Sequence, residues 1–283
     1  MVESASIAVL LATYNRVETT RKCLTSLLDS NFSQNISLII FITDDNSPDQ
    51  TVELLSQEFP NVYFYNSEGN YFWNRGMVNS WHKASEHDPD FYLLLNDDVQ
   101  MRKDALAEML FTYSLSRRDS VIIGRTFFGN ESNITYGGLM RKSFLHKFNF
   151  INAPYNSEKI CTFNANCVLI PKHSLSSVGI LDEFYTQQFG DIDLGLRFWR
   201  NNWDLIQVEK PVAELAKNFP YPHGRVSLRL SDLKYLFTHP KGLPYREVWH
   251  FYKKFGGFEI YFYIIFRYFK ILSKIFITRN FKN

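Results

Sequence analysis

A short, wholly apolar segment that ends in adjacent acids limits what this chain can fold into. Residues 91–95 read Phe-Tyr-Leu-Leu-Leu, and Asn96, Asp97 and Asp98 follow directly. An uninterrupted apolar run of this length is typical of a strand buried on both faces, as in a parallel sheet. Open α/β sheets bind ligands beyond the carboxyl ends of their strands. The segment therefore predicts either a ligand site or a solvated acidic turn that leads into a helix near Arg102.

Strand-like and helix-like segments alternate along the first hundred residues. The expected strands are 7–11, 38–42, 62–65 and 91–95, and the expected helices are 17–28, 47–59 and 75–85. Ser47 and Pro48 predict the start of the second helix, because serine is a good N-cap and proline suits the first helical position. Strands that alternate with helices of this length predict an α/β fold with a mostly parallel sheet and right-handed crossovers.

Polar residues follow three of the expected strands. They are Thr13, Tyr14, Asn15 and Arg16 after the first, Asp44 and Asp45 after the second, and Asn96, Asp97 and Asp98 after the fourth. Strand ends of a parallel sheet share one edge, so we expect a single ligand site there. Neighbouring carboxylates repel unless a cation joins them, and a divalent metal shared with a substrate phosphate is the simplest cation. The alternative for Asp44 and Asp45 is a solvated turn at a helix N-terminus.

Composition narrows the function classes. A net charge of +2 argues against a purely electrostatic nucleic-acid binder. The three cysteines fit no zinc pattern, and we expect them to be buried, reduced thiols. We expect neither a secretory signal nor a membrane-spanning helix, because no apolar run is long enough. No glycine-rich phosphate loop follows the first strand, so a metal at Asp98 would carry more of the charge compensation.

Taken in order, these segments resemble family 2 glycosyltransferases of the GT-A fold. The resemblance covers about residues 5–227. Besides the segments after the expected strands, the similar segments within that range are 66–70, 74–76, 164–171, 178–183 and 189–197. It implies a Rossmann-like, mostly parallel central sheet flanked by helices, with a C-terminal helical extension. It also implies a catalytic domain over 1–227, with nucleotide binding in about 1–100 and acceptor binding in about 101–227, and an extension over 228–283.

The resemblance implies transfer of a sugar, with inversion, from a nucleotide-diphosphate sugar to an acceptor hydroxyl. It assigns Asp191 as the catalytic base, and Asp98 and His223 as ligands of Mn²⁺ or Mg²⁺. The residues implied in nucleotide-sugar binding are Thr13, Tyr14, Asn15, Arg16, Asp44, Asp45, Asn70, Asn74, Arg75, Asn96 and Asp97. The alternative for Asp191 is an N-cap of the helix that follows it.

One position departs from the family pattern. Many relatives have Glu-Asp where this chain has Gly190-Asp191. Asp193 could compensate only if this segment is a loop, because residues i and i+2 diverge on a helix. An alternative function is therefore a non-catalytic sugar-nucleotide-binding or assembly protein of the same fold. For a catalytic glycosyltransferase, the resemblance implies a glycan or lipid-linked acceptor, as in the synthesis of bacterial surface polysaccharides such as O-antigen or capsule.

The C-terminal segment 258–277 is rich in Phe, Tyr and Ile. Its charges are Glu259, Arg267, Lys270 and Lys274, whose spacings put them along one helical face. A basic helix with a bulky apolar face suits a membrane interface, where lysine and arginine reach lipid phosphates. We therefore expect a cytoplasmic protein that is peripheral at the inner face of the cell membrane through 258–283. The alternatives are packing against the catalytic domain and a homodimer contact.

Overall fold

The computed structural model describes residues 4–31, 35–143, 147–215, 232–257 and 260–280. The chain divides into two compact units. One comprises Met1–Thr186 with Gly190–Lys217, and the other comprises Gln187–Phe189 with Asn218–Asn283. His223, the second expected metal ligand, lies outside the described residues.

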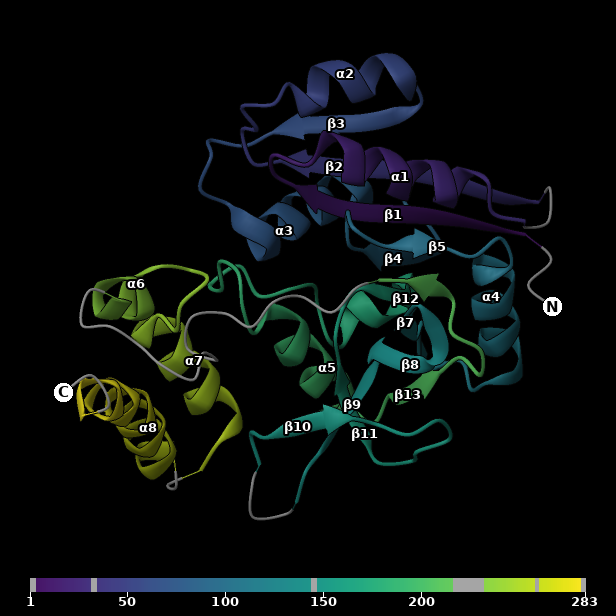
Figure 1. Ribbon diagram of the computed structural model, residues 1–283. Helices are drawn as coiled ribbons and strands as arrows, with labels where there is room; N and C mark the ends of the chain where they lie inside the picture. The colour runs from purple at the N-terminus through teal and green to yellow at the C-terminus, as the bar shows by residue number, and fades with distance from the viewer. Residues whose placement is uncertain (1–3, 32–34, 144–146, 216–231, 258–259, 281–283) are drawn as a thin grey trace. The chain divides into compact units, whose positions relative to one another are not determined.

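A seven-stranded sheet is the centre of the first unit (Figure 1). Its strand order is β13-β6-β12-β4-β1-β2-β3. The strands are β1 (Ala5–Thr13), β2 (Ile36–Asp44), β3 (Val62–Asn66), β4 (Phe91–Leu95), β6 (Ser120–Ile123), β12 (Cys167–Pro171) and β13 (Asp204–Gln207). Only β12 runs antiparallel to its neighbours in this sheet. The predicted α/β class with a mostly parallel sheet is confirmed.

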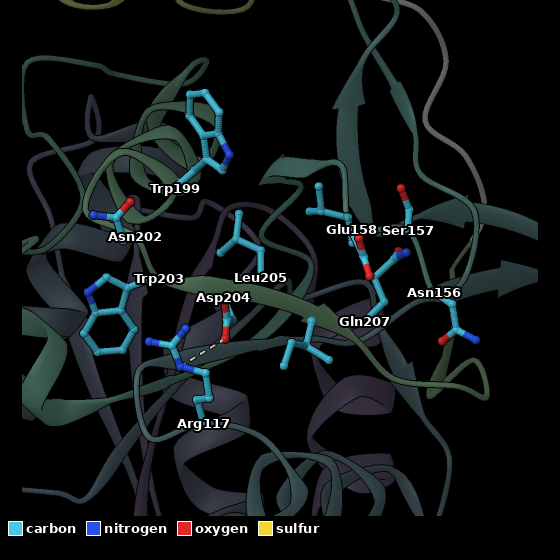
Figure 2. Close-up of a pocket in the computed structure, with 12 residues that line it drawn as sticks. Arg117, Asn156, Ser157, Glu158, Trp199, Asn202, Trp203, Asp204, Leu205 and Gln207 are labelled. Atoms are coloured by element: carbon cyan, nitrogen blue, oxygen red, sulfur yellow. Dashed lines mark ion pairs between the residues drawn. The ribbon is translucent and has the colours of Figure 1, made fainter.

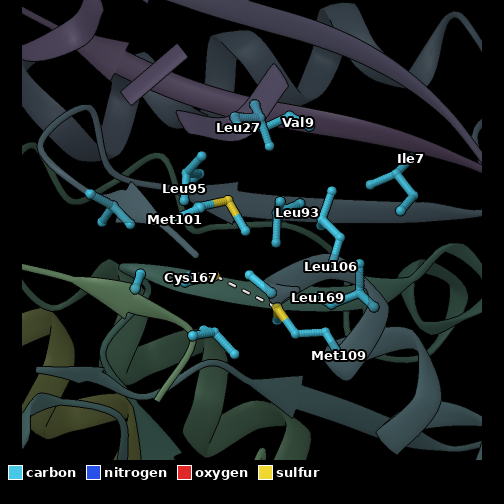
Figure 3. Close-up of a cluster of buried hydrophobic side chains, with 14 of the residues drawn as sticks. Ile7, Val9, Leu27, Leu93, Leu95, Met101, Leu106, Met109, Cys167 and Leu169 are labelled. Atoms are coloured by element: carbon cyan, nitrogen blue, oxygen red, sulfur yellow. Dashed lines mark hydrogen bonds between the residues drawn. The ribbon is translucent and has the colours of Figure 1, made fainter. Parts of the chain in front are cut away.

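Helices cover both faces of this sheet, as the alternation of side chains along β1 shows. The helices are α1 (Val17–Leu28), α2 (Thr51–Glu58), α3 (Phe72–Ser85), α4 (Ala105–Leu115) and α5 (Gly190–Arg200). Val9 and Leu11 of β1 belong to a buried cluster with residues of α1 and α4 (Figure 3). Ala8 and Leu10 belong to a second cluster with residues of α3 and α5. The three cysteines are buried free thiols, as expected.

Two small sheets and a short 3₁₀ helix complete the first unit. The order β10-β9-β11 joins Phe150–Asn152, Gly138–Arg141 and Ile160–Phe163. The order β5-β14-β7-β8 joins Gln100–Met101, Ala213–Glu214, Thr126–Phe128 and Asn130–Tyr136. The 3₁₀ helix η1 covers Lys172–Ser176.

The predicted start of the second helix at Ser47 is wrong. Helix α2 begins at Thr51, after Gln50 in a left-handed conformation. The Ser47 hydroxyl instead donates to Asp44 at 2.5 Å and accepts the Asn15 N–H at 2.7 Å. Contacts to neighbouring strand ends therefore replace the helix cap that the local sequence favours.

The second unit contains the C-terminal helices α6 (Asp232–Thr238), α7 (Tyr245–Phe255) and α8 (Ile260–Asn280). The Phe189 ring stacks on Phe251 with centroids 4.9 Å apart, so the short segment 187–189 packs within this unit. No described helix is long and apolar enough to cross a membrane.

The predicted charged face of the last helix needs a correction at Arg267. This side chain is half-buried and donates to the Tyr252 hydroxyl at 2.9 Å, so it faces the packed side of α8. Lys270 is exposed, whereas Glu259 and the side chain of Lys274 lie outside the described residues. Six apolar side chains of α8 are 37% to 69% exposed: Tyr261, Phe262, Ile265, Phe266, Phe269 and Leu272.

Replacement of Gly76 by alanine should destabilise the first unit. A Cβ on this residue of α3 would lie 2.8 Å from the Cβ of Ala12 on β1, which cannot rotate away. We expect Gly76→Ala to lower the free energy of unfolding by about 1–3 kcal/mol, as overpacking does. Ser85→Ala, at the exposed end of the same helix, is the control. Equal urea midpoints for the two variants would contradict this packing.

Candidate functional site at the carboxyl edge of the sheet

The register of the strands brings several polar segments to one edge. Thr13 pairs with Asp44 at the ends of β1 and β2. Leu95, the last residue of β4, pairs with Cys167, the first residue of the antiparallel β12. The Asn96 N–H donates to the Asn166 carbonyl at 3.0 Å. Segments that follow β1, β2 and β4 therefore share this edge with the residues that precede β12.

Arg16 lies between the two adjacent acids after β4. Its Nη1 is 2.9 Å from Asp97 Oδ1 and 3.2 Å from Asp98 Oδ2. Burial raises the pKa of Asp97 to about 6, Arg16 opposes that rise, and the neighbouring Asp98 adds to it. The Thr13 hydroxyl also contacts Asp97. A guanidinium thus provides the cation that two neighbouring carboxylates require.

Asp98 has the chemistry of a ligand for a hard divalent ion. Its Oδ1 is buried and has no hydrogen-bond partner in the described part of the chain. No group of three His, Cys, Asp or Glu side chains gathers among the described residues. Mg²⁺-like ions are commonly held by one or two carboxylates together with substrate phosphates. Asp98 with a diphosphate therefore fits such an ion without a larger protein cage.

Asp44 and Asp45 each organise a loop. Asp44 accepts the N–H of Ser47 at 2.7 Å, and burial raises its pKa. Asp45 is 7% exposed, and it accepts the N–H groups of Tyr71 and Phe72, each at 2.8 Å. Both carboxylates are therefore held by the protein, so the alternative of a solvated turn is not what the structure contains.

A second set of hydrogen bonds links the acids after β4 to the start of α5. Asn96 Oδ1 accepts from the Trp73 indole at 2.8 Å, and the Asn96 amide donates to Asn166 Oδ1. Asp191 accepts the Ala165 N–H at 3.4 Å, and Asn164 also donates to it. These contacts make the strand ends and Asp191 parts of one hydrogen-bonded edge.

Asp191 occupies the first turn of α5, one residue past the start at Gly190, so it is not the cap that precedes this helix. Its carboxylate accepts the N–H of Ile192 at 2.8 Å. Burial raises the pKa of Asp191, and the N–H groups of Ile192 and Ala165 oppose the rise.

Asp193 does not replace the missing acid at 190. It is fully buried on α5, where it pairs with Arg197 at 2.6 Å and accepts from the Tyr185 hydroxyl at 3.1 Å. Helical geometry turns it away from Asp191, as the spacing requires. Asp193 therefore stabilises the interior of the first unit.

The remaining expected nucleotide-sugar residues differ in exposure. Tyr14, Asn70 and Arg75 are exposed, and the Arg75 Nε donates to the Glu183 carbonyl at 3.2 Å. Asn74 is fully buried. Trp73 and Asn166 belong to the hydrogen-bonded edge, but the sequence did not single them out. Trp73 was not among the expected nucleotide-sugar residues, and Asn166 lay unmarked within the 164–171 resemblance.

The first unit also contains a cavity of about 600 Å³ (Figure 2). Its lining includes Trp199, Trp203, Asp204 and Glu158. All four residues of β13, Asp204 to Gln207, line this cavity. Its lining contains none of Arg16, Asp97, Asp98 and Asp191, so within the described part of the chain the cavity is separate from the acids of the carboxyl edge.

Replacement of Asp45 by alanine should loosen the segment between β3 and α3. The change leaves two backbone N–H groups and the Ser67 hydroxyl without their carboxylate acceptor. We expect Asp45→Ala to lower the free energy of unfolding by about 2–4 kcal/mol, because bonds to charged groups are among the stronger ones. The exposed Asp29→Ala is the control. Chemical denaturation that gives both variants the same stability would refute the anchoring role.

A family model for glycosyl transferase family 2 matches residues 8–179, and no curated protein matches the chain. S. aureus TarS is similar in fold, with 17% identity and a TM-score of 0.56 over 76% of this chain and 37% of TarS. TarS 1-349 in complex with UDP-GlcNAc has 15% identity and a TM-score of 0.55 over 76% of this chain and 59% of that one.

The mannosyltransferase PcManGT from Pyrobaculum calidifontis, in complex with GDP-Man and Mn²⁺, has 13% identity and a TM-score of 0.56. That match covers 78% of this chain and 60% of the mannosyltransferase. This chain spans less than two thirds of each of the three structures, and the likeness establishes the GT-A fold. Because the family model matches more than half of its residues, the chain belongs to glycosyl transferase family 2.

Proposed function

We propose that this protein is an inverting glycosyltransferase that moves a sugar from a nucleotide-diphosphate sugar to an acceptor hydroxyl. The observation that carries the proposal is the continuous set of contacts at the carboxyl edge of the sheet. That set joins Arg16, Asp97 and Asp98 to Asn96, and Asn96 through residues 164–166 to Asp191. A donor diphosphate and a base for the acceptor can therefore meet at one edge.

The donor side of the proposed site must stabilise a leaving diphosphate. Asp98 would hold a divalent ion, Mn²⁺ or Mg²⁺, which when bound neutralises charge on the departing phosphates. Arg16 already lies beside both acids, so its guanidinium can turn to the phosphates when an ion occupies Asp98. Asp44 and Asp45 support the loops around the nucleotide. Thr13, Tyr14, Asn15, Asn70 and Arg75 complete the proposed donor contacts.

The acceptor side requires a base. As the acceptor oxygen attacks the anomeric carbon, the bond to the diphosphate oxygen breaks and the hydroxyl proton passes to the Asp191 carboxylate. Burial raises the pKa of Asp191, which makes its carboxylate a better proton acceptor than a solvated one. Attack on the face opposite the leaving group inverts the anomeric centre.

We also propose a division of labour along the chain. Residues 1–227 would form the catalytic region, with the donor bound by about 1–100 and the acceptor by about 101–227. A glycan or lipid-linked acceptor, as in bacterial surface polysaccharide synthesis, agrees with the resemblance. The exposed aromatic side chains of α8 support a peripheral contact with the membrane. A homodimer contact through α8 is the competing role for the same surface.

Replacement of Asp98 by alanine should abolish metal-dependent donor binding and turnover. We expect wild-type protein to show a higher melting temperature with UDP and Mn²⁺ together than with UDP alone, because binding stabilises the folded state. Asp98→Ala should lose that difference. Asp90→Ala, at the opposite end of β4, is the control. An unchanged Mn²⁺-dependent shift in Asp98→Ala would remove Asp98 as the metal ligand.

Replacement of Asp191 by asparagine should lower kcat by about 10²–10⁴-fold, the range for loss of a general base. Release of nucleoside diphosphate can be measured first with UDP-GlcNAc and GDP-mannose, the sugars bound by proteins of similar fold. In wild type, activity should fall as the pH drops through a pKa above the ordinary aspartate value, because the base is active when deprotonated. Wild-type kcat in Asp191→Asn would rule out this role.

The same experiment separates catalysis from binding alone. A wild-type protein that binds a donor in the presence of Mn²⁺, yet turns over neither donor nor acceptor, would favour the non-catalytic sugar-nucleotide binder. The sequence feature behind this alternative is Gly190, which stands where many relatives have a glutamate.

The exposed face of α8 should bind anionic vesicles. Phe266 is 69% exposed, and Phe266→Glu replaces its apolar contact with a charge that anionic lipid repels. We expect a roughly tenfold loss of binding to phosphatidylglycerol vesicles in co-sedimentation. Phe128→Glu, at a 51% exposed phenylalanine of the first unit, should bind as wild type does. Equal vesicle binding by wild type, Phe266→Glu and Phe128→Glu would exclude α8 as the membrane contact. Wild-type dimers that form with rising protein concentration, and that Phe266→Glu dissociates, would favour the homodimer contact.

A further inference from the structure

Asn74 ties α3 to the segment that precedes the proposed base. Its Nδ2 donates to the carbonyl of Asp182 at 2.9 Å and to that of Tyr185 at 2.7 Å. Its backbone N–H donates to the Thr186 carbonyl at 2.9 Å. The side chain is fully buried. Both side-chain donors of Asn74 are therefore used inside the protein.

The remaining polar atom of Asn74 is directed at Gly190. Asn74 Oδ1 is buried and has no hydrogen-bond partner among the described residues. A Cβ built on Gly190 would lie 1.7 Å from that oxygen, 2.7 Å from Asn74 Cγ and 3.5 Å from Asn74 Cβ. The carboxamide therefore occupies the space that any side chain at 190 would need.

Gly190 is the first residue of α5, and Asp191 follows it in the same turn. The backbone at 190 is therefore packed directly against the carboxamide, and the next residue carries the proposed base. We infer that Asn74 is a positioning residue for Asp191, and that it requires glycine at 190. This inference rests on the proposed function for the role of Asp191, but the contact between Asn74 and Gly190 stands without it.

The inference gives Asn74 a different role from nucleotide-sugar binding. A donor ligand would need a free polar atom at the surface of the site, whereas Asn74 is buried and bonded to carbonyls of 182–186. Loss of its side chain should let the start of α5 shift. Displacements of about 1 Å can cost a hundredfold in rate while ligand binding elsewhere is unaffected. Turnover, and not donor affinity, should therefore respond to changes at 74.

A double-mutant cycle tests the contact by thermal unfolding. Gly190→Ala should lower Tm by roughly 4 °C or more, because the new methyl group meets Oδ1. In the Asn74→Ala background the nearest remaining atom of residue 74 is the Cβ at 3.5 Å, an ordinary contact. Gly190→Ala should then lower Tm by less than half as much. Additive shifts would overturn the coupling.

Kinetics with the donor that the wild type uses test the positioning role. Asn74→Ala should lower kcat at least about tenfold, with the donor KM and the Kd for UDP with Mn²⁺ unchanged within about twofold. Asn79→Ala is the control, because Asn79 lies on the same helix and its side chain donates to Thr43 at 3.0 Å, away from 182–190. Its kcat should match the wild type.

Two other outcomes have distinct meanings. A loss of UDP affinity in Asn74→Ala as large as the loss of kcat would make Asn74 a donor ligand and overturn the inference. A wild type that turns over no donor would end the proposed function and the positioning role with it, whereas the Tm cycle would still decide whether Asn74 and Gly190 are coupled.

Discussion

The parallel pairing of β1 with β2 and β4 is the constraint on which the rest of the site depends. This pairing fixes where three strands end and the polar segments after them begin. It also brings Arg16 into contact with Asp97, 81 residues further along the chain, and with the neighbouring Asp98. Adjacent carboxylates, here the buried Asp97 and the partly buried Asp98, are unfavourable alone, so this edge needs a cation. The protein supplies a guanidinium, and Asp98 Oδ1, which has no hydrogen-bond partner among the described residues, is the oxygen proposed to bind a metal.

The carboxylates of this edge have two kinds of role. Asp45 accepts the N–H groups of Tyr71 and Phe72 at the start of α3, and Asn74 on that helix donates to carbonyls that precede α5. A continuous support therefore runs from the end of β2 to Gly190, next to the proposed base. The proposal assigns chemistry to Asp98 and Asp191, whereas the contacts of Asp45 and Asn74 are made within the protein framework.

Local sequence pattern predicted β1 to β4, and the helices that lie between them, because these segments carry apolar residues in a regular pattern, as in β4. Local sequence pattern failed where a side chain bonds to residues that are distant in the sequence. Ser47 would cap α2, but Asp44 and Asn15 bind it. Trp73 and Asn166 could not be assigned to the edge because their partner, Asn96, lies 23 and 70 residues away. Family resemblance located Asp191, whereas only the packing of Asn74 gives a physical reason for Gly190.

In the proposed site, one sheet edge holds a divalent ion and a nucleotide diphosphate together. Anomalous X-ray scattering at the manganese edge, from crystals grown with Mn²⁺ and UDP, measures this directly. We expect a single strong peak within about 2.0–2.3 Å of Asp98 Oδ1, with Arg16 turned toward the diphosphate. A manganese peak at any other carboxylate, with Arg16 still between Asp97 and Asp98, would contradict it.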